Sequence, residues 1–134
     1  MRIDGEDYRN RDIEGHAVTL DDDALRSRVD AHGGTVTVDP FADILRHLST
    51  VHPSRYIGLI RDVDAVAMTE VAELRSQTDA LRLVAFVDRL YDAQIPIFAT
   101  GVPLDQVFPD DMLAGGYRKK YLRATSRMIA LTSA

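Results

Sequence analysis

Hydrophobic and polar positions alternate along the chain in blocks that predict strands and helices in turn. Short runs of apolar or β-branched residues predict strands at residues 16–20, 35–38, 63–71 and 95–101. Longer runs with apolar residues at helical spacing predict helices at residues 19–34, 39–48 and 76–93. The stretch 52–60 favours a short helix, although an apolar run of this length also suits a strand. This alternation predicts an α/β fold with a small, at least partly parallel sheet covered by helices.

Several helix starts carry local signals in the sequence. Three aspartates, Asp21–Asp23, open the first predicted helix, where the helix dipole favours negative charge. We expect Asp39 to cap the next helix and Pro40 to be its first residue. Ser76 and Asp79 have the spacing of a capping box, with aspartate in place of glutamate.

The chain is predicted to end with a basic amphipathic helix from about Tyr117 to Leu131. It follows a turn or short helix at residues 102–108 and a loop at 109–116. Apolar residues at helical spacing form one stripe that should pack on the body: Tyr117, Tyr121, Ala124, Met128 and Leu131. Five cations lie off this stripe: Arg118, Lys119, Lys120, Arg123 and Arg127.

Charge is distributed unevenly along the chain. The net charge is −5, and the stretch from Tyr117 onward carries +5, so residues 1–116 carry −5 − 5 = −10. A body this acidic excludes a general polyanion binder, and we do not expect a nucleic acid partner. Two interpretations of the basic row remain open, a solvated face paired with acidic neighbours or a contact with an anionic partner.

The length and composition suit one domain. We expect a polar, extended arm at residues 1–15 and a single domain at residues 16–134. The 134 residues include no cysteine, which excludes disulfides and thiolate chemistry. The N-terminus lacks the apolar core of a signal peptide and no apolar run reaches membrane-spanning length, so we expect a cytoplasmic protein without a membrane span.

No catalytic, cofactor or metal site is expected within this chain. The four histidines lack metal-ligand spacing, and Asp21–Asp23 lack the alternation and glycine turn of a calcium loop. There is no G-x-x-x-x-G-K-[ST] phosphate loop and no G-x-S-x-G nucleophile elbow. Thr100 ends a predicted strand, where ligands often bind, but a tight exit from the strand is the favoured interpretation.

Two stretches resemble the C-terminal region of the ZapE-type P-loop ATPases. These stretches are "DALRLVAFVDRLYDAQIPIFATGVPLDQVF" and "YLRATSRMIAL". The matching positions are Arg82, Asp88, Tyr91, Val102, Pro103, Leu104, Arg123, Ser126 and Arg127. "DGEDYR" near the start resembles a D-Y-R element that follows the ATPase core of that family. The chain departs from the family pattern at Leu81 and in "GGYRKKY".

The resemblance implies a place and a role for this chain. The family belongs to the AAA+ group, has bacterial cell-division members and mitochondrial relatives, and carries its phosphate loop upstream of the D-Y-R element. The chain therefore resembles a C-terminal domain that does not hydrolyse ATP alone, whereas the parent ATPase uses ATP and Mg. Implied partners are the upstream ATPase core, neighbouring subunits and a protein client.

The resemblance and the basic helix together give a set of candidate contact residues. These are Arg82, Arg118, Lys119, Lys120, Arg123 and Arg127. Arg123 and Arg127 are the foremost candidates for a contact with a neighbouring subunit. Neither has an acid four residues away in the helix, so we expect both to project and their charge reversal to change stability by less than about 1 kcal/mol.

Two other function classes remain. The chain could be a stand-alone interaction module that docks an acidic partner through its basic helix. The reading frame upstream of Met1 discriminates this from the ATPase interpretation. The third class is an enzyme with a small-molecule site beside Thr100, which ligand screening by thermal shift would reveal.

Overall fold

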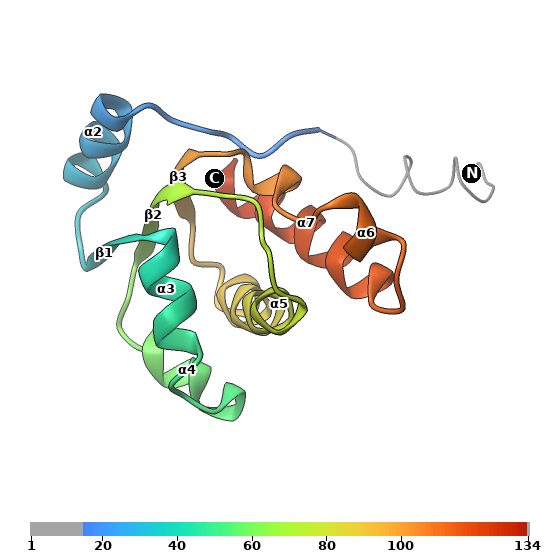
Figure 1. The fold of residues 1–134 in the computed structure, drawn as a ribbon. Helices are drawn as coiled ribbons and strands as arrows, with labels where there is room; N and C mark the ends of the chain where they lie inside the picture. The colour runs from blue at the N-terminus through green and yellow to red at the C-terminus, as the bar shows by residue number, and fades with distance from the viewer. Residues whose placement is uncertain (1–14, 134) are drawn as a thin grey trace.

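A computed structural model describes residues 15–133 of the chain. Its fold is mixed α/β, as the sequence predicted (Figure 1). The predicted arm at residues 1–15 lies outside the described residues apart from Gly15, and so does the "DGEDYR" element.

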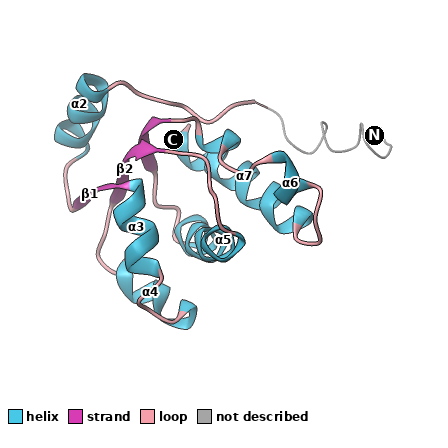
Figure 2. Ribbon diagram, in the orientation of Figure 1, coloured by secondary structure: helices cyan, strands magenta, loops and turns pink. Residues whose placement is uncertain are grey.

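The centre of the fold is a three-stranded sheet in which all strands are parallel (Figure 2). The strand order is β1-β2-β3, with bounds Val36–Pro40, Ala65–Val71 and Ile97–Gly101. The α-helices are α2 (Asp22–His32), α3 (Phe41–Leu48), α4 (Tyr56–Leu59), α5 (Gln77–Asp92), α6 (Asp110–Leu113) and α7 (Arg118–Thr132). Two 3₁₀ turns, η1 at Pro53–Arg55 and η2 at Leu104–Gln106, complete the described elements.

The central strand β2 is buried on both faces, which explains its nearly continuous apolar sequence. Val66 and Met68 belong to the main core, whereas Ala65 and Ala67 belong to a smaller cluster on the opposite face. Successive residues of a strand point to opposite faces, so the short run AVAM supplies both clusters.

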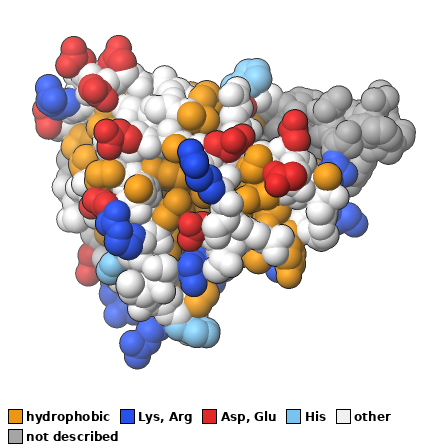
Figure 3. All heavy atoms as spheres, in the orientation of Figure 1, with side chains coloured by type: hydrophobic (Ala, Val, Ile, Leu, Met, Phe, Trp, Pro, Cys, Tyr) orange, Lys and Arg blue, Asp and Glu red, His pale blue; other side chains and the backbone are white. Residues whose placement is uncertain are grey.

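Helices cover the two faces of the sheet unequally. The main core joins the sheet to α3, α4, α5 and α7, while α2 packs on the other face through Leu25 (Figure 1). Acidic side chains gather on the outer surface of α2 (Figure 3). Helix α5 is central to the main core because it contacts α3, α4 and α7.

The predicted helix starts are confirmed at α2 and α5. The Asp21 carboxylate accepts a hydrogen bond from the Ala24 amide at 2.7 Å, and the Ser76 hydroxyl accepts one from the Asp79 amide at 3.2 Å. The helical interpretation of residues 52–60 is also confirmed, as η1 followed by α4.

The predicted strand at residues 16–20 is wrong. This segment is extended but forms no ladder, and the Leu20 amide donates one bond of 2.8 Å to the Ala99 carbonyl of β3. Two other amides of the segment donate hydrogen bonds to side chains. The Ala17 amide donates to the Asp105 carboxylate at 3.0 Å, and the Val18 amide donates to the Thr132 hydroxyl at 3.0 Å. The segment follows the surface between β3 and α7 instead of extending the sheet.

Two further boundaries differ from the sequence predictions. Pro40 pairs with Thr69 as the last residue of β1 and precedes α3, so Asp39 does not cap that helix. The backbone of Pro40 is extended, with ψ at 143°, because strand pairing continues through it. The predicted loop at 109–116 contains the short helix α6, whose first turn holds Asp110 and Asp111 where the dipole favours acids.

Candidate functional site

The apolar stripe of α7 packs on the body as predicted, with one exception. Tyr121, Ala124 and Met128 are fully buried, and Tyr121 stacks on Phe108 with ring centroids 4.8 Å apart. Tyr117 precedes the helix and is 40% exposed. The stripe therefore holds α7 against the body, whereas Tyr117 at the start of the helix reaches solvent.

Arg123 and Arg127 share one carboxylate on the neighbouring helix α5. Arg127 Nη1 lies 2.5 Å from Asp88 Oδ1, and Arg123 Nη2 lies 3.5 Å from Asp88 Oδ2. The Arg127 guanidinium also lies over the Tyr91 ring, 4.7 Å from its centroid. The expectation that both arginines project freely is therefore wrong, and their role in a contact with a neighbouring subunit stays a prediction.

This cluster contains four of the residues that carried the family resemblance. Asp88 and Tyr91 lie on α5, and Arg123 and Arg127 lie on α7. Helices α5 and α7, which are far apart in sequence, meet through these four residues. The packing of α5 against α7 therefore explains why these positions match the family pattern. The sequence left open a basic row paired with acidic neighbours, and Asp88 is such a neighbour for Arg123 and Arg127, but nothing in the sequence identified it.

The first turn of α7 concentrates positive charge in an unfavourable place. Arg118, Lys119 and Lys120 occupy its first three positions, no acid lies there, and Tyr117 provides no side-chain cap. Lys120 Nζ lies 5.7 Å from the centroid of the Tyr117 ring. Within residues 15–133, Arg118 and Lys119 have no ion-pair partner. Cations at a helix N-terminus oppose the helix dipole, so this turn carries a local energetic cost.

Arg82 lies apart from the basic row of α7. Its Nη1 atom is 3.5 Å from Asp79 Oδ1 on the same helix. Burial raises the pKa of Tyr56, and the charge of Arg82 partly opposes that rise. The structure therefore divides the candidate residues into the cluster around Asp88, a first turn of α7 in which Lys119 and Lys120 are exposed and Arg118 is partly buried, and the separate Arg82.

Thr100 is part of a tight strand exit, as the favoured interpretation held. It is buried, and its hydroxyl accepts a hydrogen bond from the Glu70 amide at 3.1 Å. The next residue, Gly101, has φ at +105°, and an added Cβ would lie 2.5 Å from the Val71 amide nitrogen. Only glycine fits this close approach of two strands.

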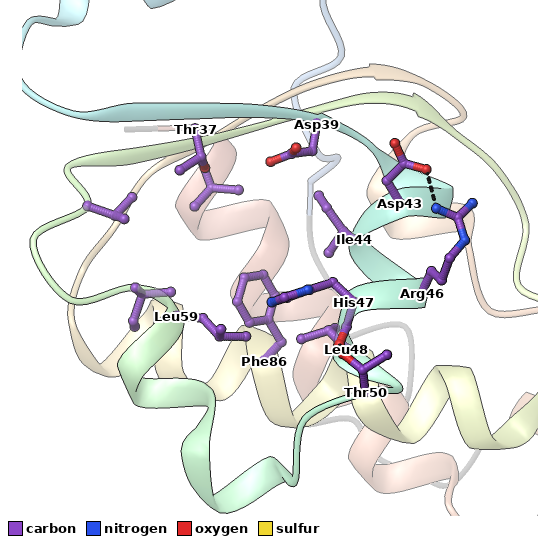
Figure 4. A pocket seen from close by; sticks show the side chains of 13 residues that line it. Thr37, Asp39, Asp43, Ile44, Arg46, His47, Leu48, Thr50, Leu59 and Phe86 are labelled. Carbon is purple, nitrogen blue, oxygen red and sulfur yellow. Dashed lines mark hydrogen bonds and ion pairs between the residues drawn. The ribbon is translucent and has the colours of Figure 1, made fainter.

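A hollow of about 560 Å³ lies between β1, α3 and α4, and sequence reasoning did not find it (Figure 4). Its apolar floor includes Ile44 and Phe86, and polar side chains including Asp39 and His47 line it as well. The hollow forms where β1 and β2 meet α3, α4 and α5. No local pattern in any one of them signals it.

Neither ATP nor Mg²⁺ fits the residues that the structure describes. Its sequence has no phosphate loop, and the described residues contain no group of three or more histidine, aspartate or glutamate side chains able to hold a metal ion. In the same part of the chain, no helix is long and apolar enough to cross a bilayer.

A family model of AFG1-like ATPases matches residues 12–134. The chain belongs to the AFG1-like ATPase family. This match confirms the resemblance to the ZapE-type ATPases, which belong to the same family. Searches of curated proteins and of solved structures gave no significant match.

Proposed function

We propose that this chain is the C-terminal, non-hydrolysing part of an AFG1-like ATPase and that it supports contacts between subunits or with a client protein. The family match supports the ATPase context. The observation that carries the contact role is the first turn of α7, where Arg118, Lys119 and Lys120 lie beside the exposed Tyr117.

The unfavourable electrostatic energy of the first turn of α7 supports a role in binding another molecule. Three successive cations oppose the helix dipole and repel one another, and a stable helix start would carry acids instead. An anionic surface on another molecule would relieve both effects. Positions that break a local folding rule are often functional ones, because the compensating interaction lies in a partner.

Arg123 and Arg127 have a different part in this proposal. Their shared contact with Asp88 holds α7 against α5, and so it fixes the direction in which the first turn points. ATP and Mg²⁺ would act in the ATPase core that joins this chain. The link to cell division rests on the ZapE-type resemblance, whereas the cytoplasmic location rests on the sequence without a signal-peptide core or a membrane-spanning run, and both remain part of the proposal.

The test reverses the charge of the first turn in the complete ATPase. We expect Arg118→Glu/Lys119→Glu/Lys120→Glu to weaken assembly or client binding at least tenfold in sedimentation velocity with ATP present. The change should not unfold the domain, because acids at a helix start are favourable. The control Arg26→Glu alters an exposed arginine on α2. Unchanged assembly and client binding in the triple variant would refute the contact role.

A further inference from the structure

The hollow beside β1, α3 and α4 combines an apolar interior with one acid that has no ion-pair partner among residues 15–133. Asp43 is engaged by Arg46, whose Nη1 atom lies 2.6 Å from Asp43 Oδ1. Asp39 is exposed and has no ion-pair partner among residues 15–133. Figure 4 shows Asp39 on one side of the hollow and His47 and Phe86 on the other. An occupant that matches this arrangement has an apolar group beside a cation.

The size of the hollow suits an aromatic side chain with part of its neighbours. Its volume of about 560 Å³ falls within the usual range for binding pockets, about 300–1,000 Å³. Among the described residues, Arg46 is the one arginine that lines the hollow, and its charge is paired with Asp43. Attraction to a cation therefore depends on Asp39 at the hollow itself.

The chain presents one matching segment on its own surface. Four large hydrophobic residues are exposed in the described part: Val18, Val38, Ile57 and Tyr117. Among these, Tyr117 alone is followed directly by cations, in the sequence YRKK. Tyrosine and arginine are enriched in protein interfaces because they combine a large apolar area with polar ends.

The segment and the hollow lie too far apart to meet within one molecule. Figure 1 shows α3 and α4 on one side of α5, and α6 with the start of α7 on the other. A contact between them therefore joins two copies in a head-to-tail arrangement, which generates rings or filaments.

We propose that the hollow of one subunit receives the Tyr117–Lys120 turn of a second copy, with the Tyr117 ring on the apolar floor and a cation at Asp39. This inference rests on the proposed function and names the partner of the first turn of α7. The interface is heterologous, so each subunit contributes its hollow to one neighbour and its turn to the other.

Sedimentation velocity of the 134-residue chain, from about 10 μM to 1 mM, tests the contact. We expect association that weakens between about 50 and 300 mM salt, because charged groups at an exposed interface are screened. Asp39→Lys and Lys119→Glu should each lower the association constant at least tenfold. The double variant Asp39→Lys/Lys119→Glu should regain most of that loss because the charges are exchanged.

Matched controls separate this effect from a change in net charge. Asp30→Lys and Arg26→Glu alter exposed positions on α2 by the same charge and should leave association unchanged. A chain that stays monomeric throughout the range, or that loses association equally in the controls, overturns the inference. If first-turn reversal impairs the complete ATPase but Asp39→Lys does not, the proposed function stands and the hollow is not its partner.

Discussion

Asp88 on α5 is the acid that links this helix to two arginines of the C-terminal helix α7. Its carboxylate accepts hydrogen bonds from Arg127 and Arg123. The side chain is only 20% exposed, so these contacts are partly shielded from water. We predict that Asp88→Asn lowers the free energy of unfolding by about 1–2 kcal/mol, since hydrogen bonds between charged groups exceed neutral ones. Urea denaturation measures this change.

The control for this prediction is an exposed pair on the same helix. Asp92 Oδ2 lies 2.9 Å from Arg89 Nη2, and its side chain is 60% exposed. Asp92→Asn should change stability by less than about 0.5 kcal/mol, as exposed ion pairs contribute little. Equal effects at the two aspartates would contradict the bridging role of Asp88. The same geometry predicts that Arg127→Glu destabilises the domain more than Arg123→Glu.

Removing the hydroxyl should affect stability differently at two buried tyrosines, Tyr56 and Tyr121. The Tyr56 hydroxyl donates to the Leu48 carbonyl at 2.8 Å, whereas the Tyr121 hydroxyl is buried without a partner among the described residues. Tyr56→Phe should cost about 1 kcal/mol, and Tyr121→Phe should be neutral or stabilising. Thermal melts distinguish them, and a larger loss at Tyr121 would reveal a contact outside the described residues.

These tyrosines also predict how stability changes at alkaline pH. Burial raises the pKa of both side chains above the ordinary value of 10.0. The unfolded chain therefore loses these protons first, and the stability present below about pH 10 falls as pH rises further. Denaturation at pH 9 and above pH 10 should show this fall, and the double phenylalanine variant should reduce it.

At the scale of elements, α5 is the main support of the larger core. Leu90 is fully buried on this helix, which packs against α3, α4 and α7. Leu90→Ala should cost about 2–5 kcal/mol, the range for emptying a buried leucine site. Guanidinium denaturation measures it, and a loss below about 1 kcal/mol would mean that α5 is peripheral.

The elements that were predicted correctly are determined by interactions between residues close together in sequence. Ser76 and Asp79 lie three residues apart in sequence and in the cap, so the sequence shows the start of α5. The end of β1 depends instead on pairing between Pro40 and Thr69, a contact across the sheet. The segment at residues 16–20 has a strand-like composition, but side chains of distant elements accept its hydrogen bonds.

The same limit applies to the candidate site. The cations of α7 and their helical alignment follow from the sequence, and so does the buried stripe. The partner of Arg127 lies 39 residues away on α5, and no pattern within α7 indicates it. The hollow is lined by residues of β1, β2, α3, α4 and α5 together, so only the folded chain reveals it.

At the scale of the whole molecule, an acidic body carries a basic turn at one end. Residues 1–116 carry a net charge of −5 − 5 = −10, against +5 in the rest of the chain. Such asymmetry favours head-to-tail approach of like molecules, and it accelerates association in low salt. The contact role of the first turn of α7 is the central claim of this account.

The most direct measurement of that claim is ATP turnover by the AFG1-like ATPase core, alone and joined to this chain. We predict that the joined chain raises turnover at least tenfold and that Arg118→Glu/Lys119→Glu/Lys120→Glu removes most of the increase, while the isolated variant domain melts no earlier than the unaltered one. Turnover that is the same with the unaltered chain, the variant chain and no chain would contradict the account.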